Sequence, residues 1–203
     1  MKVILGTANF GEEYGWSHTK AREVHKIMDK ALDLGIDTIE TAYDYHCLDT
    51  LCERKKDFNF IFKADTEEQF REAEDSLGDI TSMKHHPPYD GWWYRSIYNT
   101  EYISYGTSEF PFNIIDQRFG KYLEDRGYSI ARSVFIQGLA FKMPDFHGIP
   151  FYHLCWNFVR NNPNIDGIVV GVDTAAQLED IFRIPQYEID YSKIGGEGWI
   201  KKL

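Results

Sequence analysis

Residues 31–45 read ALDLGIDTIETAYDY, and this stretch shows the pattern on which the chain is built. Apolar residues at helical spacing lead into it, and Gly35 ends the helix that they predict, with Thr19 expected as its cap. The segment Ile36–Thr41 is rich in residues that favour β-structure, so a strand follows directly. Strands that alternate with helices in this way indicate βαβ units and a parallel sheet.

The same alternation extends along the chain. Further strands are predicted at Lys2–Leu5, Phe58–Phe62, Ile80–Lys84, Tyr102–Tyr105, Ser129–Phe135 and Ile165–Val170. Helices are predicted after the capping-box patterns Thr66–Gln69 and Thr174–Gln177 and, from apolar spacing, over Ile114–Glu124 and Pro150–Arg160. In such α/β folds, functional residues gather at the carboxyl ends of the strands.

Composition bounds the class of protein. The 203 residues, 43% of them hydrophobic, are enough for one domain, which we expect to span residues 1–203. A membrane span is not expected, because the chain has no run of about 18 apolar residues. The formal charge of −10 disfavours nucleic acid and anionic membranes as partners.

Cysteine usage predicts a cytoplasmic protein without a metal site. The chain has three cysteines, an odd number, and its first residues resemble a strand and not an export signal, so free thiols in a reducing compartment are expected. A zinc site from His46, Cys47 and Cys52 is disfavoured, because their spacing fits no common ligand pair.

Side chains that can move a proton stand where successive strands end. A free tyrosine has a pKa of about 10, and a nearby lysine cation favours its ionised form. Tyr45, Lys63 and His85 could supply a phenol, an ammonium and an imidazole, with Glu40 holding the lysine. Each residue alone has an ordinary structural role, in packing, solvation or strand capping. Their grouping at consecutive strand ends favours chemistry.

At these residues the sequence resembles the aldo-keto reductases. The opening segment is similar to that of a bacterial branch often linked to sugar metabolism. Matching segments follow the family's order over most of the chain: Leu5–Gly11 with Tyr14–Gly15, Ala31–Ile36, Glu40–Tyr45, Ile61–Lys63, His85–Pro87, Pro111–Asn113 with Asp116–Arg118, Arg132–Leu139 and Gly167–Asp180. The resemblance implies an α/β fold, a (β/α) barrel of TIM type, and an NADPH- or NADH-dependent oxidoreductase that acts on a small-molecule aldehyde or ketone.

The resemblance also implies roles for individual residues. Tyr45 is the general acid that protonates the carbonyl oxygen, Lys63 lowers its pKa, and His85 orients the carbonyl. Glu40 stands where the family has aspartate. The implied cofactor site comprises Gly6, Thr7, Ser108, Arg132, Ser133, Gly138, Leu139, Gly171, Val172, Asp173, Thr174 and Gln177. Its phosphates would meet the positive end of the helix that follows Thr174.

The chain is short for this family, and the missing length falls around the fifth βα unit. Between Pro88 and Phe110 there is no room for two full units, so either the fifth helix and its neighbours are absent or one strand is missing. The segment Ile103–Ser108 is a candidate fifth strand. An open barrel would expose an edge, which Trp92–Tyr94 could cover in this chain or in a homodimer.

Other departures leave choices open. His85 and His86 both fit the family's histidine motif, and adjacent strand residues point to opposite faces, so one of them is catalytic; we favour His85. Arg132 stands where a ring-stacking tyrosine is common. No basic residue follows Thr174 before Arg183, so the sequence does not distinguish NADPH from NADH.

Three functions are compatible with these features. The first is reduction of a carbonyl compound, or the reverse reaction. The second is a non-redox binding or interaction protein that keeps a shortened barrel. The third is a lyase that forms a Schiff base through Lys63, whose pKa an apolar pocket would lower.

Overall fold

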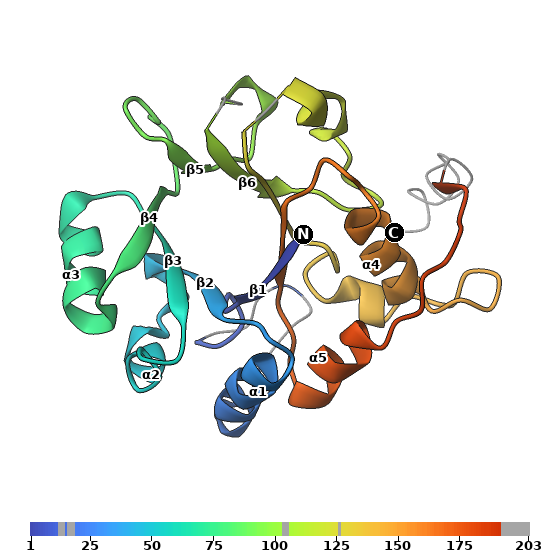
Figure 1. The fold of residues 1–203 in the computed structure, drawn as a ribbon, viewed down its shortest axis with the longest axis horizontal. Coiled ribbons are helices and arrows are strands. Elements are labelled where there is room, and N and C mark those ends of the chain that lie inside the picture. Colours follow the sequence, from blue (N-terminus) through green and yellow to red (C-terminus); the bar gives the residue numbers. More distant parts are fainter. Residues whose placement is uncertain (12–14, 16–18, 103–105, 126, 192–203) are drawn as a thin grey trace.

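The strands of this computed structural model form one closed parallel barrel in the order β1 to β8 (Figure 1). The structure describes residues 1–11, 15, 19–102, 106–125 and 127–191. The strands are β1 (Lys2–Gly6), β2 (Thr38–Ala42), β3 (Asn59–Ala64), β4 (Ile80–Lys84), β5 (Tyr94–Ser96), β6 (Thr107–Pro111), β7 (Ser129–Arg132) and β8 (Gly167–Val170).

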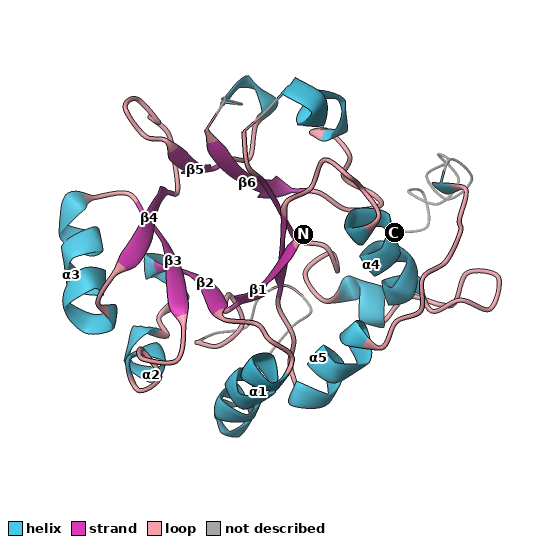
Figure 2. Ribbon diagram, viewed as in Figure 1, coloured by secondary structure: helices cyan, strands magenta, loops and turns pink. Residues whose placement is uncertain are grey.

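The α-helices are spread unevenly around the barrel (Figures 1 and 2). The α-helices are α1 (Ala21–Asp33), α2 (Leu48–Cys52), α3 (Glu67–Leu77), α4 (Phe151–Arg160) and α5 (Ala175–Phe182). The short 3₁₀ helices are η1 (Tyr43–Tyr45), η2 (Thr100–Tyr102), η3 (Gly120–Asp125) and η4 (Leu139–Phe141). Among the described residues, no α-helix lies between β4 and β7, so this is where the fold is shortened.

The shortening removes helices and no strand. β5 is only three residues long, yet it pairs with β4 at Lys84 and Arg95 and with β6 from Tyr94 to Ser96. β1 pairs with β8, which closes the sheet. The alternative of a missing strand is therefore wrong, and the ring of strands has no open edge. A homodimer thus loses the reason for which it was expected, although dimerisation itself stays a prediction.

The barrel interior contains a small apolar cluster that is separate from the large core. Ile4, Met83, Ile130 and Val169 form a small cluster of their own, whereas Leu5 belongs to the large core between the sheet and the helices. Successive strand residues point to opposite faces, so an inward Ile4 implies an outward Leu5. By the same alternation, Lys63 on β3 and Glu109 on β6 face the interior, because their neighbours Phe62 and Phe110 belong to the large core.

Local sequence signals predicted several elements correctly. Both capping boxes are present: Thr66 and Thr174 accept the N–H groups of Gln69 and Gln177, whose side chains bond back to the cap residues. Thr19, in contrast, is not the cap of α1. Its hydroxyl donates to the carbonyl oxygen of Val172 at 3.0 Å.

Two predictions around the shortened region need correction. Of the predicted strand Tyr102–Tyr105, Tyr102 ends η2 and residues 103–105 lie outside the described residues. The fifth strand is not Ile103–Ser108, because β5 lies earlier in the chain and Thr107 and Ser108 belong to β6. The predicted helix Ile114–Glu124 is reduced to η3. The side chain of Asn113 accepts the N–H groups of Ile115 and Asp116 at 2.9 and 2.8 Å and so holds a bend there, but the chain does not continue from this bend into an α-helix.

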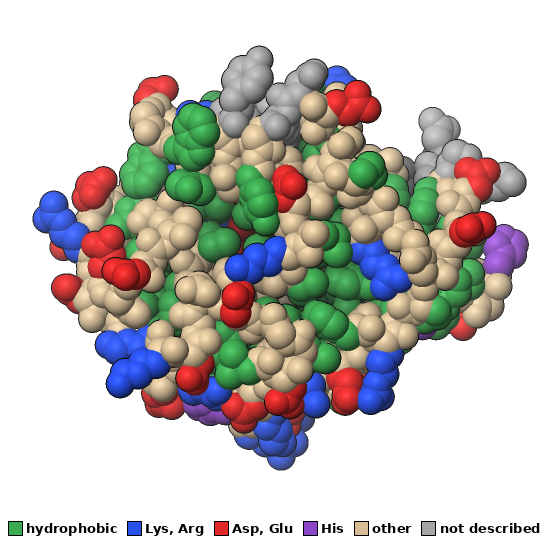
Figure 3. Space-filling model, viewed as in Figure 1, with side chains coloured by type: hydrophobic (Ala, Val, Ile, Leu, Met, Phe, Trp, Pro, Cys, Tyr) green, Lys and Arg blue, Asp and Glu red, His purple; other side chains and the backbone are tan. Residues whose placement is uncertain are grey.

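The surface carries charges of both signs. On the face seen in Figure 3, basic and acidic side chains are interspersed and no extended basic patch is visible. Within the part of the chain that the structure describes, no helix has the length and apolarity needed to cross a bilayer.

Candidate active site

The ammonium of Lys63 is the centre of a buried polar cluster inside the barrel. It donates to the hydroxyl of Tyr45 at 2.9 Å and forms ion pairs with Glu40 and with Glu109, the latter at 3.1 Å. An ammonium has three N–H donors, so these three oxygens can use all of them. Lys63 is 1% exposed, and its position is fixed by these partners.

A second cation shares one of these carboxylates. Arg132, at the end of β7, lies with its Nε 3.3 Å from the Oε1 atom of Glu109. Ser96 on β5 donates to the same oxygen at 3.2 Å. The guanidinium of Arg132 also lies over the ring of Tyr98, 4.2 Å from its centroid. Glu109 therefore connects Lys63 with Arg132 across the barrel.

Burial and charge set the protonation states of the cluster. Burial raises the pKa of Glu40 to about 7, against the lowering effect of Lys63 and with a further rise from Glu109. Burial also raises the pKa of Tyr45, and this outweighs the lowering by Lys63. Tyr45 therefore remains a protonated phenol at neutral pH, which suits a proton donor. Lys63 does lower the pKa of Tyr45, as expected, but burial together with Glu40 and Glu109 raises it by more.

The pKa of Lys63 is raised as well, which for an amine favours the charged form. Burial opposes its charge, but Glu109, Glu40 and Tyr45 raise its pKa well above the usual value. Lys63 is therefore a permanent cation in this cluster.

The raised pKa of Glu40 predicts a specific dependence of stability on pH. The folded protein holds this proton more tightly than the unfolded chain, so the stabilisation is complete below pH 4.5 and is lost as pH rises through about 7. Glu40→Gln should remove this dependence, which amounts to about 3 kcal/mol at 1.36 kcal/mol per pKa unit. Denaturant unfolding of both proteins across this pH range measures the difference, and parallel curves would contradict the assignment.

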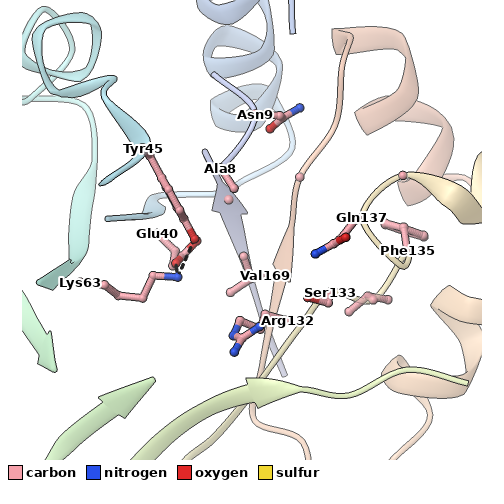
Figure 4. A pocket seen from close by; sticks show the side chains of 14 residues that line it. Ala8, Asn9, Glu40, Tyr45, Lys63, Arg132, Ser133, Phe135, Gln137 and Val169 are labelled. Atoms are coloured by element: carbon pink, nitrogen blue, oxygen red, sulfur yellow. Dashed lines mark hydrogen bonds and ion pairs between the residues drawn. The ribbon is translucent and has the colours of Figure 1, made fainter. Parts of the chain in front are cut away.

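A cavity of about 70 Å³ opens beside this cluster. Figure 4 shows Tyr45, Lys63 and Glu40 on one side of it and Ser133, Phe135 and Gln137 on the other. The predicted site residues that line it are Gly6, Glu40, Tyr45, Lys63, Arg132, Ser133, Gly138 and Gly171. The structure thus brings together residues from strand ends that are far apart in the sequence.

The other predicted cofactor residues do not line the cavity. They are Thr7, Ser108, Leu139, Val172, Asp173, Thr174 and Gln177. Ser108 precedes the inward-facing Glu109 on β6, so its buried side chain points to the opposite face of the sheet. Thr7 donates its hydroxyl to the backbone of Glu40 at 3.2 Å, which makes it a structural neighbour of the cluster.

In the turn between β8 and α5, some of the backbone N–H groups already donate to a side chain of the protein. Gln177 accepts the N–H groups of Asp173 and Thr174 at 2.7 and 3.1 Å, and Asn9 donates to the carboxylate of Asp173 at 3.1 Å. The capping box does not involve the N–H groups of Ala175 and Ala176, which begin α5. These two donors at a helix N-terminus remain suited to a phosphate.

The two candidate histidines have different surroundings. His85 is buried, with its Nε2 atom 3.0 Å from the hydroxyl of Tyr98. Burial, followed by the charge of Lys63, lowers the pKa of His85 to about 3, so its ring is neutral. The exposed His86 is bound through Nδ1 to Asp65 at 2.6 Å. The expectation that the two rings point to opposite faces is wrong: β4 ends at Lys84, and the ring centroids of His85 and His86 lie 4.1 Å apart, both beside Tyr98. Burial and the effect of Lys63 still favour His85 over His86, although His85 does not line the cavity.

One group of potential metal ligands adjoins the cluster. In the described part of the chain, ligand atoms of Asp65, His85 and His86 lie within 4.8 Å of one another. The ammonium of Lys84 lies 3.5 Å from the Asp65 carboxylate and opposes a second cation there. The sulfur atoms considered for zinc point elsewhere: Cys47 lies against Thr7 and Thr41, and Cys52 donates to a backbone carbonyl.

Sequence reasoning missed several residues of the site. The cavity is also lined by Ala8, Asn9, Val134, Phe135, Gln137 and Val169. Glu109, Ser96 and Tyr98 complete the charged cluster. Glu109 left no clear sequence signal, because the strand TSEFP is mostly polar and only the structure shows that it is buried throughout.

Comparison with known proteins relates this geometry to one fold. No protein-family model matches the sequence, and no curated protein matches it. Among solved structures, the holo form of the aldo-keto reductase AKR11C1 from Bacillus halodurans superposes with a TM-score of 0.71 at 15% identity, covering 99% of this chain and 91% of that one. The chain has the fold of the aldo-keto reductases.

A second similar structure supports this assignment. The glycerol dehydrogenase AKR11B4 from Gluconobacter oxydans superposes with a TM-score of 0.68 at 14% identity, covering 95% of this chain and 89% of that one. At this identity the likeness shows the aldo-keto reductase fold, and the chemistry must be argued from the site itself.

Proposed function

We propose that this protein is an oxidoreductase that reduces an aldehyde or ketone with NADPH or NADH, with Tyr45 as the proton donor. The observation that carries the proposal is the contact of 2.9 Å between the Tyr45 hydroxyl and the buried ammonium of Lys63 on the wall of the cavity. A protonated phenol held by a permanent cation can give its proton to a carbonyl oxygen and leave a phenolate that the ammonium stabilises.

The residues present suit parts of such a cofactor. Tyr45, Gly138 and Gly171 line one cavity, and the N-terminus of α5, outside that lining, has the backbone donors that suit a phosphate. A bound nicotinamide would supply the hydride, while this chain supplies the proton and the position of the carbonyl group. The neutral ring of His85 is bound to the Tyr98 hydroxyl outside the cavity lining, so a role in orienting the carbonyl would require Tyr98 to move.

Cofactor binding and turnover test the proposal together. Titration with NADPH and with NADH should quench tryptophan fluorescence for at least one of them, and the same cofactor should support reduction of an aldehyde such as nitrobenzaldehyde. A protein that binds neither cofactor and turns over no aldehyde would count decisively against carbonyl reduction. The free thiols of Cys47, Cys52 and Cys155 suit a cytoplasmic location for this reaction.

A non-redox binding protein is the second candidate. It is favoured by Arg132, which places a guanidinium on the cavity and is held there by Glu109 and the ring of Tyr98. Tight binding of a nucleotide without turnover of any carbonyl compound would support this alternative.

The geometry disfavours the Schiff-base lyase. Such a lysine needs a lowered pKa so that its amine can attack a carbonyl carbon. The carboxylates around Lys63 raise its pKa instead. Borohydride should therefore trap no adduct between Lys63 and a carbonyl compound.

A further inference from the structure

Lys63 contacts two buried carboxylates, and these differ in how they are held. The Oε1 atom of Glu109 accepts hydrogen bonds from Lys63 at 3.1 Å and Ser96 at 3.2 Å, and the Nε atom of Arg132 lies 3.3 Å from it as an ion pair. Two of these three partners carry a full positive charge. Donors that converge on one oxygen stabilise its ionised form, because hydrogen bonds to a charged acceptor strengthen with its charge.

Glu40 has a poorer set of partners. Among the described residues, its carboxylate has one polar partner, the ammonium of Lys63, and it is 2% exposed. The ionisable groups that face it are Lys63 from β3, Tyr45 from η1, Glu109 from β6, Arg132 from β7 and Cys47 before α2. Two carboxylates that share one ammonium cannot both ionise without repulsion, so a proton resides on the one with fewer donors.

We propose that Glu109, and not Glu40, is the positioning carboxylate that keeps the Lys63 ammonium on the Tyr45 hydroxyl, while Glu40 is the carboxyl that carries a proton. This inference rests on the proposed function, which it deepens by assigning the fixed negative charge of the site. Glu109 also holds Arg132 at the cavity, so one buried anion orders both cations. Sequence resemblance alone assigns the anchoring role to Glu40.

Exchange of each carboxylate for an amide separates the two roles. Gln mimics a protonated glutamate, so Glu40→Gln should leave Lys63 nearly as it is. Glu109→Gln removes the fixed anion, and the reactive free-amine form of Lys63 should become about tenfold more abundant for each pKa unit that is lost. The readout is acylation of Lys63 by an amine-reactive reagent, measured by mass spectrometry. Glu74→Gln, at an exposed position on α3, is the matched control.

The expected order of Lys63 acylation is Glu109→Gln well above Glu40→Gln, with the latter close to wild type and to Glu74→Gln. The reverse order, or equal effects of the two buried substitutions, would overturn the proposal. Glu109→Asp keeps the charge, so it should partly restore the low reactivity of Lys63, which a purely structural role of the side chain does not predict.

A measurement on the unsubstituted protein covers the case in which Glu109→Gln does not fold. Carbon NMR of protein labelled at the glutamate carboxyl carbon should show one buried resonance that titrates near neutral pH and is absent from the Glu40→Gln spectrum. If that titrating resonance persists in Glu40→Gln, the proposal is wrong. Neither readout needs cofactor or substrate, so a protein that shows the expected labelling but no turnover would refute the reductase function alone.

Discussion

Replacing Tyr45 with phenylalanine is expected to lower the turnover number for carbonyl reduction by about 10²- to 10⁴-fold, the contribution typical of a positioned general acid. The substitution removes the hydroxyl on which Lys63 is held at 2.9 Å and leaves the aromatic ring in place. Cofactor binding should therefore change much less than turnover. Steady-state kinetics and a fluorescence titration on the same preparation measure the two quantities separately.

A neighbouring tyrosine provides the control. Tyr43 lies in the same 3₁₀ helix, but its hydroxyl donates outward to Glu72 at 3.2 Å. Tyr43→Phe should retain wild-type turnover. If both variants keep full activity, Tyr45 is not the acid, and if both lose it equally, the loss reports damage to the turn.

Replacing Lys63 with methionine is expected to destabilise the fold by about 3–5 kcal/mol, the usual cost of removing one partner of a buried ion pair. The change leaves Glu40 and Glu109 buried without the ammonium that both contact. The loss should shrink as pH falls, because the folded state can then take up protons on these carboxylates. Urea unfolding at several pH values provides the measurement.

Two further variants show whether charge or packing causes the loss of stability in Lys63→Met. Lys84→Met removes the next lysine along the barrel, whose partner Asp65 is 35% exposed and can be solvated instead, so its cost should be much smaller. Adding Glu109→Gln to Lys63→Met should recover part of the stability, because the fixed buried charge of Glu109 is then absent. A pH-independent loss that Glu109→Gln does not relieve would mean that packing, and not charge, makes Lys63 important.

Local patterns predicted much of the scaffold. The capping boxes at Thr66 and Thr174 depend on side chains three residues apart, which a sequence displays directly. The proximity of Tyr45, Lys63 and Glu40 was also predictable, because parallel strands place their carboxyl ends at one edge of the sheet.

The features that were not predicted from the sequence depend mainly on contacts between distant segments. β5 is three residues long and is recognisable only through its pairing with β4 and β6. The helix predicted from Ile114 is replaced by a turn that the side chain of Asn113 stabilises. The direction of the Tyr45 pKa shift followed from burial together with Glu109, a residue that approaches Lys63 only in the closed barrel.

A crystal structure with NADPH or NADH and a carbonyl compound tests most directly whether Tyr45 is the proton donor. We expect the carbonyl oxygen to lie within hydrogen-bond reach, about 3 Å, of the Tyr45 hydroxyl, with Lys63 still bound to that hydroxyl and the nicotinamide ring beside it. A ring that binds away from Tyr45, or a carbonyl oxygen that contacts Arg132 and leaves Tyr45 without a substrate contact, would contradict the proposed reduction.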